Sequence, residues 1–308
     1  MNSSFMNSFR PSTSHYHVVH ETIYSYQSIV TLSHQYLHLA PRSFRHQEVI
    51  SRSMTVDPVS SESTMRLDYF GNCTQSLTIT APHRNLRVTT EFVVAVKQRF
   101  KMSQMSQSMP WEVLRDRKAA FDPSTTDEPQ LFLFASPHVG CSTELRQYAL
   151  QSYTPNRPHL EAAMDLTQRI FNDFEFDDHA TDISTPLEQV LKGRRGVCQD
   201  FAQLMIGCLR SLGLAARYVS GYILTHPPEG EARMIGADAS HAWVSVFCPE
   251  HGWVDFDPTN QCLVQHEHIT LGWGRDFSDV TPLRGVVLGG DDHQLQVNVT
   301  VTPVSTST

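Results

Sequence analysis

The feature that most constrains the fold of this chain is a helical pattern followed within a few residues by strand patterns. In VCQDFAQLMIGCLRSLG, residues 197–213, apolar side chains recur at the spacing of one helix face, and Gly213 is typical of a helix end. ARYVSGYIL, HAWVSVF and GWVDFDPTN then read as strands rich in Val, Ile, Trp, Tyr and Phe. We expect a largely buried helix over 198–212 that packs on an antiparallel sheet, which is an α+β fold.

A separate β domain is predicted before this core. HVVHETIYSY alternates apolar and polar residues, and MRLDYF and CTQSLTIT flank a hairpin-like turn at Gly71 and Asn72. Near the end of the chain, RGVVL and QLQVNVTVTPV flank a GGDD turn and suggest another hairpin. The expected organisation is a disordered N-terminus at 1–14, a small β-sandwich-like domain at 15–98, a connecting helical region at 99–158, the core at 159–265 and a C-terminal β extension at 266–308.

Composition narrows the class of protein. A net charge of −8 argues against nucleic acid as a partner, and no stretch approaches the length of a membrane span. The N-terminus has no apolar core of the signal-peptide kind, so we expect a cytoplasmic protein with six free thiols. His251, His266 and His268 with Cys248 and Cys262 fit no standard zinc spacing, so we expect no metal and no cofactor.

Two cysteines in the predicted helix have different expected roles. Cys208 lies within the apolar stripe and reads as a core residue. Cys198 lies in the first turn, where unpaired backbone N–H groups and the helix dipole favour a thiolate and can receive an oxyanion. Gly196 allows a sharp entry into the helix. Cys198 is therefore a candidate nucleophile.

A cysteine nucleophile needs a base, and the base needs an acceptor that orients it. His241 begins one predicted strand and Asp257 ends the next. If Phe247 pairs with Trp253 across the PEHG loop, Asp257 is diagonal to His241 on one face of the hairpin. If the strand pairing is shifted by two residues in total, the two residues are directly opposed, again on one face. Asp255 has the same parity, so spacing alone leaves both aspartates open.

The motifs GVCQDFAQLMIGCLRSLGLAARYVSGY, SHAWVSVF and GWVDFDPTN resemble the transglutaminase-like core of the papain-like thiol fold. With HETIYSYQSIVTLSHQYLHLAPR and GRDFSDVTPLRGVVLGG, the chain is similar to bacterial transglutaminase-like proteins often described as cysteine proteases. The resemblance implies that Cys198 is the nucleophile, that His241 is the general base and acid, and that Asp257, which precedes Pro-Thr, orients His241.

The resemblance leaves the second oxyanion donor open. Animal transglutaminases use an upstream Trp, but residues 159–197 contain none, and no acidic calcium loop is visible. Gln199 or a backbone N–H are candidate donors, and Trp243 and Tyr222 are further candidates for the oxyanion site or the cleft. The resemblance also suggests ATP-grasp and helical proteins as partners.

The expected function is hydrolysis of amide, peptide or isopeptide bonds in a protein or peptide substrate, through an acyl-enzyme. Two alternatives stay open at this point. One is cross-linking of protein glutamines to amines, and the other is a catalytically silent interaction module.

Overall fold

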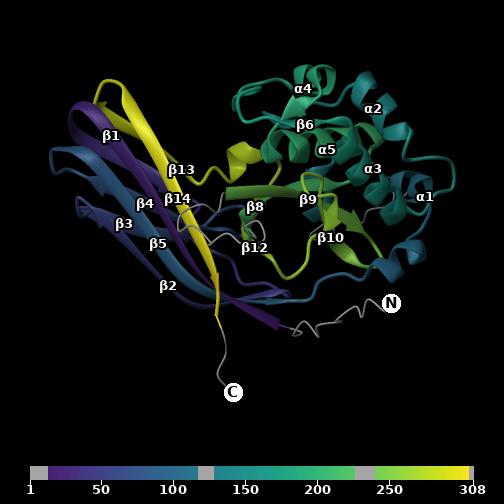
Figure 1. Ribbon diagram of the computed structural model, residues 1–308, viewed down its shortest axis with the longest axis horizontal. Helices are drawn as coiled ribbons and strands as arrows, with labels where there is room; N and C mark the ends of the chain where they lie inside the picture. Colours follow the sequence, from purple (N-terminus) through teal and green to yellow (C-terminus); the bar gives the residue numbers. More distant parts are fainter. Residues whose placement is uncertain (1–12, 117–127, 226–239, 305–308) are drawn as a thin grey trace, which may run out of the picture.

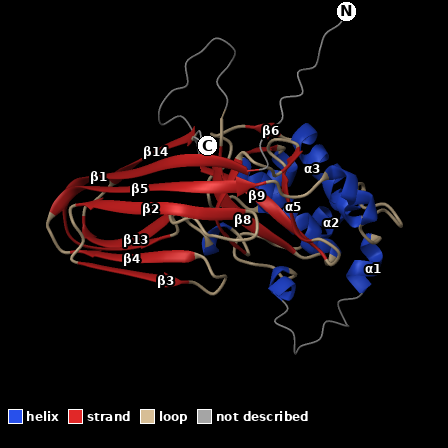
Figure 2. Ribbon diagram, turned by 90° about the horizontal axis from the view of Figure 1, so that it is seen from below, coloured by secondary structure: helices blue, strands red, loops and turns tan. Residues whose placement is uncertain are grey.

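The computed structural model describes residues 13–116, 128–225 and 240–304. Long strands occupy one end of the molecule and the helices gather at the other, around a second sheet (Figures 1 and 2). This segregation of strands and helices is that of an α+β protein, as the sequence predicts.

The first sheet has seven antiparallel strands with β1 at its centre. β1 is unusually long and alternates buried with more exposed residues along its first half, which is the pattern of a strand with one covered face. The strands are β1 (Thr13–Leu37), β2 (Gln47–Asp57), β3 (Glu62–Leu67), β4 (Cys73–Ile79), β5 (His83–Lys97), β13 (Leu283–Gly289) and β14 (His293–Pro303).

The predicted C-terminal hairpin is wrong. β13 pairs with the second half of β1 and β14 with the first half, so the two run one after the other along the same partner. Gly289 and Gly290 both have a φ of +91°, and the backbone of Gly290 and Asp292 accepts hydrogen bonds from Ser28 and Gln27. The GGDD segment is thus a break between β13 and β14, which pair with successive parts of the same strand, because β1 continues past this segment.

On the other edge of β1, β4 pairs with its second half and β5 mainly with its first half. The β3–β4 hairpin predicted around Gly71 is confirmed. One apolar cluster draws on both halves of this sheet: Leu37 and Leu77 come from the β4 half, and Leu86 and Val88 from the β5 half. The two halves therefore enclose a shared core, as in a β-sandwich.

The second sheet, in the core, is antiparallel with the order β11-β10-β9-β8-β12. Helices pack on it and around it. Its strands are β8 (Ala216–Ile223), β9 (Ser240–Cys248), β10 (Gly252–Asp257), β11 (Cys262–Leu263) and β12 (His268–Gly274). The helices are η1 (Met102–Gln107), α1 (Trp111–Asp116), η3 (Glu128–Phe132), α2 (Thr143–Leu150), α3 (His159–Asp173), α4 (Leu187–Gly193), α5 (Cys198–Leu212) and η4 (Phe277–Asp279), and a short parallel pair joins β6 (Glu175–Phe176) to β7 (Arg195–Gly196).

Helix α5 has the predicted bounds and is buried over nearly its whole length. Gly213 ends it in the left-handed region with a φ of 83°, and its N–H bonds back to the last turn. Cys208 is fully buried within the main core cluster, together with Ala242 and Val244 of β9. The apolar stripe therefore fixes α5 against one face of the sheet and sets where its N-terminus lies.

Three expected domain boundaries need correction. The stretch 266–308 is not a separate extension, because β12 completes the core sheet beside β8 while β13 and β14 complete the first sheet. The region 99–158 is not only a connector, since Trp111, Leu145 and Tyr148 lie in the core cluster with α5. Of the expected disordered 1–14, residues 1–12 lie outside the described part, and β1 already begins at Thr13. In the described residues no helix is long and apolar enough to cross a membrane.

Candidate active site

Cys198 is the first residue of α5 and is half-buried. The carboxylate of Asp200 turns back to accept the Val197 N–H at 2.8 Å and the Thr181 hydroxyl at 2.6 Å. Burial raises the pKa of Asp200, while these two hydrogen bonds lower it. Asp200 thus caps the helix start and fixes the turn that carries the thiol.

Gly196 is needed for this cap. A Cβ built at Gly196 would lie 2.6 Å from Asp200 Oδ2 and 2.9 Å from Asp200 Cβ. No side chain fits there without moving the carboxylate. Gly196 therefore permits the Asp200 side chain to lie close to the backbone. This is a more specific reason for glycine than the sharp entry into the helix that the sequence indicates.

His241 and Asp257 meet at the open end of the β9–β10 hairpin. The register pairs Trp253 with Phe247, as the first of the two predicted registers requires, and Asp257 follows as the diagonal neighbour of His241. The distance from His241 Nε2 to Asp257 Oδ2 is 2.7 Å, and both side chains are buried.

Cys198 also acts on this imidazole. Burial alone would lower the pKa of His241. The charge of Asp257 and its hydrogen bond, with a hydrogen bond and charge from Cys198, raise the pKa to about 10. Because Nε2 faces Asp257, Nδ1 is the ring nitrogen left for the thiol. The site therefore favours an imidazolium held against the Asp257 carboxylate.

Five hydrogen bonds from residues that the structure describes converge on Asp257. Oδ2 accepts hydrogen bonds from His241 at 2.7 Å, from His268 at 3.0 Å and from the Asn260 side-chain amide at 2.7 Å. Oδ1 accepts hydrogen bonds from the backbone N–H groups of Thr259 at 2.9 Å and Asn260 at 3.2 Å. Burial would raise the pKa of Asp257, but the charge of His241 and the hydrogen bonds from His241 and His268 hold it far below its usual range. Asp257 is therefore a fixed carboxylate.

The structure separates the two aspartates that spacing left open. Asp255 forms a salt bridge with the buried guanidinium of Arg99 and lies 3.4 Å from Trp243 Nε1. The carboxylate that contacts His241 is that of Asp257. Asp255 thus holds Arg99 and Trp243 behind the candidate site and does not contact His241.

Of the three residues predicted for the oxyanion site or the cleft, two lie in the protein interior and one lies beside the thiol. Trp243 is fully buried, and its ring lies edge-on to His268 with centroids 5.3 Å apart, so it backs the histidines and does not line a cleft. Tyr222 is also fully buried, and its hydroxyl lies 2.8 Å from His20 Nδ1 at the contact with the first sheet. Both are corrections to the predicted cleft. Gln199 is half-buried in the first turn of α5, beside the thiol.

Sequence reasoning missed His268, Asn260 and Asp200. His268 reaches Asp257 because β12 joins the sheet beside β8, a long-range pairing with no local signal. Asn260 and Asp200 had local signals. An Asp three residues after a helix cap is a capping residue, and DPTN is a turn whose aspartate binds the N–H groups after it.

Three groups at the site carry metal-binding atoms. One atom each from His241, Asp257 and His268 lies within 4.8 Å of the others. Two ligands on a shared tetrahedral zinc would be about 3.3 Å apart, whereas Nε2 of His241 and Oδ2 of Asp257 are 2.7 Å apart. The donor set is therefore arranged for hydrogen bonds and does not fit zinc.

Two other thiols, Cys208 and Cys262, differ from Cys198 in their surroundings. Burial raises the pKa of Cys208 to about 12, and it has the same effect on Cys262, where the negative charges of Asp257 and Glu267 contribute further. Such thiols stay protonated near neutrality. Cys208 is thus a core residue, as predicted.

A cysteine at a helix N-terminus, facing a His–Asp pair at the end of an antiparallel hairpin, defines the transglutaminase-like core of the papain-like fold. Residues 146–258 match the transglutaminase-like superfamily, and residues 16–95 match the bacterial transglutaminase-like N-terminal region. An uncharacterised protein of Mycobacterium tuberculosis is 40% identical over 298 residues, which cover 94% of this chain and 93% of that protein. The chain belongs to this bacterial transglutaminase-like family.

Two further relatives cover different shares of the chain. The crystal structure of a proposed cysteine protease from Cytophaga hutchinsonii shares the fold, with a TM-score of 0.75, 19% identity and coverage of 97% of this chain and 93% of that one. A protein-glutamine gamma-glutamyltransferase of Pseudomonas aeruginosa is 39% identical over 80 residues, 26% of this chain and 12% of that protein.

Proposed function

We propose that this protein is a thiol-dependent acyl-transfer enzyme that hydrolyses amide, peptide or isopeptide bonds through an acyl-enzyme. The observation that carries the proposal is His241 held between Cys198 and Asp257, with its pKa raised to about 10. An imidazolium of this kind keeps a neighbouring thiol in the thiolate form and has a proton to give.

In the first half of the proposed reaction, the sulfur of Cys198 bonds to the substrate carbonyl carbon. The carbonyl oxygen becomes an oxyanion beside the first-turn N–H groups of α5, with the Gln199 amide as the candidate side-chain donor. The C–N bond then breaks, and the leaving nitrogen takes the proton of His241. An amine or ammonia leaves, and a thioester remains on Cys198.

In the second half, water attacks the thioester carbon and gives a proton to His241. The S–C bond breaks, the carboxylic acid leaves and the Cys198–His241 pair is restored. Asp257 keeps the imidazole oriented in both halves and offsets its charge, which is the role of the third member in such triads.

Hydrolysis is preferred over cross-linking for a reason of location. The proposal places the protein in the cytoplasm, and six free cysteines agree with a reducing compartment. Free amines and accessible glutamines are abundant there, so indiscriminate cross-linking would be harmful.

A single assay separates the three possible functions. A glutamine-containing peptide is incubated with the protein, with and without a fluorescent primary amine. Hydrolysis releases ammonia at a rate that the amine does not change, and Cys198→Ala abolishes the release. Incorporation of the amine would make the protein a transglutaminase instead. If a panel of glutamine, peptide and isopeptide substrates gave neither product, and acyl probes left Cys198 unmodified, the chain would be a silent interaction module.

A further inference from the structure

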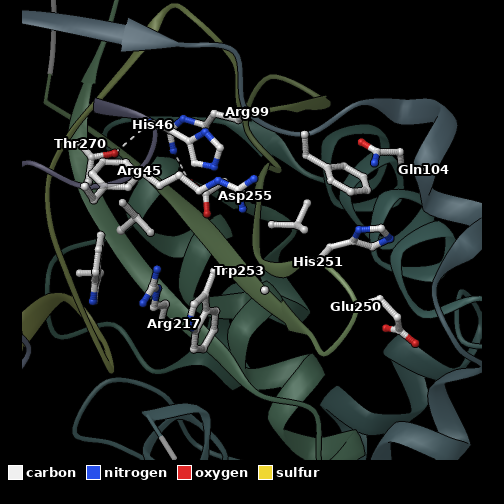
Figure 3. A pocket seen from close by; sticks show the side chains of 16 residues that line it. Arg45, His46, Arg99, Gln104, Arg217, Glu250, His251, Trp253, Asp255 and Thr270 are labelled. Carbon is white, nitrogen blue, oxygen red and sulfur yellow. Dashed lines mark hydrogen bonds and ion pairs between the residues drawn. The ribbon is translucent and has the colours of Figure 1, made fainter. Parts of the chain in front are cut away.

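A cavity of about 560 Å³ lies on the face of the core sheet that points away from α5 (Figure 3). Arg217 and Trp253 line it, and they alternate along β8 and β10 with residues that pack on α5. Its opposite wall comes from the segment before β2 and the segment after β5, which include Arg45 and Arg99. Cys198, His241 and Asp257 do not line it, so this cavity is separate from the candidate active site.

Positive charge exceeds negative charge in this cavity, although the chain as a whole carries −8. Arg45, Arg99 and Arg217 line it together with two acidic residues, Asp255 and Glu250. Asp255 is already paired with Arg99. Figure 3 shows Arg45 and Arg99 grouped at the end of the cavity that holds Asp255, whereas Glu250 lies at the far side. The end near Arg45 is therefore suited to an anion.

The side chain of Arg99 is held deep in this wall, since it is only 5% exposed. Besides Asp255 it donates to the His268 carbonyl at 3.1 Å and to the Thr270 hydroxyl at 3.0 Å. Its Nε is buried and has no hydrogen-bond partner among the described residues. A guanidinium fixed in this way is pre-organised to attract an incoming anion.

The imidazole of His46, which also lines the cavity, lies in the same positive electrostatic field. The pKa of His46 is lowered, first by burial and then by the charges of Arg99 and Arg45, against a smaller opposing effect of the Gln98 carbonyl and Asp255. In the described residues, no carboxylate lies within salt-bridge distance of the exposed Arg45, which reaches the cavity from the loop before β2.

The second wall is aromatic. The Arg217 guanidinium lies 4.1 Å from the ring centroid of Trp253 and 3.8 Å from that of Trp273. Phe44 and Phe100 also line the cavity. Aromatic walls beside fixed cations suit a planar or apolar body that carries a negative group, and the volume is that of a small-molecule site.

We propose that this cavity binds a small organic anion whose carboxylate or phosphate lies near Arg45 and Arg99 and whose planar or apolar body lies against Trp253. The ligand chemistry is that of an aromatic or otherwise planar acid. Cys198 does not line the cavity, so binding there does not require acyl transfer at that thiol.

The test uses the full chain with Cys198→Ala, which removes any turnover. Benzoate, phenyl phosphate and the neutral benzamide are titrated by calorimetry and by tryptophan fluorescence, since two of the four tryptophans line the cavity. We expect both anions to bind and benzamide to bind at least about tenfold more weakly, because it lacks the charge that the guanidinium groups recognise. The tighter of the two anions tells whether the cavity prefers a carboxylate or a phosphate group.

A matched pair of variants locates the binding. Arg45→Gln should weaken both anions at least about tenfold, whereas Arg66→Gln, an exposed arginine of β3 outside the cavity, should leave binding unchanged. Thermal unfolding of both variants checks that they are folded. Equal affinity for benzoate and benzamide, no binding of either anion, or undiminished binding by folded Arg45→Gln would each overturn the proposal.

Discussion

The Nε2 atom of His268 lies 3.0 Å from Asp257 Oδ2, the same oxygen that receives His241 at 2.7 Å. The two histidines differ in charge. Burial lowers the pKa of His268, despite the opposing effect of the Asp257 hydrogen bond, while Asp257 and Cys198 raise the pKa of His241 to about 10. One carboxylate therefore holds a neutral imidazole and an imidazolium, so only His241 is suited to move a proton.

Replacing His268 with leucine should lower kcat and leave KM nearly unchanged. The variant removes one hydrogen bond from a buried carboxylate, which costs roughly 1–2 kcal/mol, or about 5- to 30-fold in rate. His268→Gln, whose amide can donate to Asp257, should recover part of the loss. Steady-state kinetics measure both variants, and wild-type kcat in a folded His268→Leu would exclude a positioning role.

Asp257→Asn should lower kcat by about three to four orders of magnitude, because the imidazole loses its orienting charge. Asp255→Asn is the matched comparison two residues away. It breaks the Arg99 salt bridge, so we expect its main effect on thermal unfolding and a far smaller effect on turnover. A larger loss of kcat in Asp255→Asn than in Asp257→Asn would reverse the assignment.

The alkaline limb of the pH–rate profile should lie near pH 10. His241 keeps its proton until the pH rises through its pKa of about 10, and above that value the general acid is lost. The raised pKa also stabilises the folded protein below pH 6.5, and this stabilisation declines as the pH rises to about 10. Asp257→Asn should move the His241 titration to lower pH, which NMR of the imidazole measures. An unshifted titration would show that Asp257 does not set the charge of His241.

Gly196→Ala should destabilise the helix start by about 1 kcal/mol or more, since the new methyl group displaces the Asp200 cap. Alkylation of Cys198 should also slow as its turn shifts. Gly193→Ala is the control, because a Cβ there meets nothing within 4 Å. Denaturant unfolding and alkylation rates measure both, and equal behaviour of the two variants would rule out the close approach as the reason for Gly196.

Local patterns were enough to predict the centre of the site. The apolar stripe determines where α5 begins and hence that Cys198 lies in its first turn. The short PEHG loop allows few registers, so alternation along β9 and β10 brings His241 and Asp257 to one face. These predictions succeeded because each depends on residues that are close in sequence.

The predictions that failed depend on distant parts of the chain. His268 contacts Asp257 only because β12 pairs with β8, and Tyr222 is buried because the first sheet packs against β8. The GGDD segment looks like a hairpin turn until the length of β1 is known. Periodicity cannot report such pairings, since it reflects which face of an element is covered and not what covers it.

The most direct test of the central claim is a peptide map of the protein after brief incubation with a p-nitrophenyl ester and an acid quench. The thiolate should displace p-nitrophenolate and leave a thioester on Cys198, while the exposed Cys141 stays unmodified. Cys198→Ala should show no burst of p-nitrophenolate. An acyl group found chiefly on Cys141 or another residue, or an undiminished burst from Cys198→Ala, would contradict the assignment of Cys198 as the nucleophile.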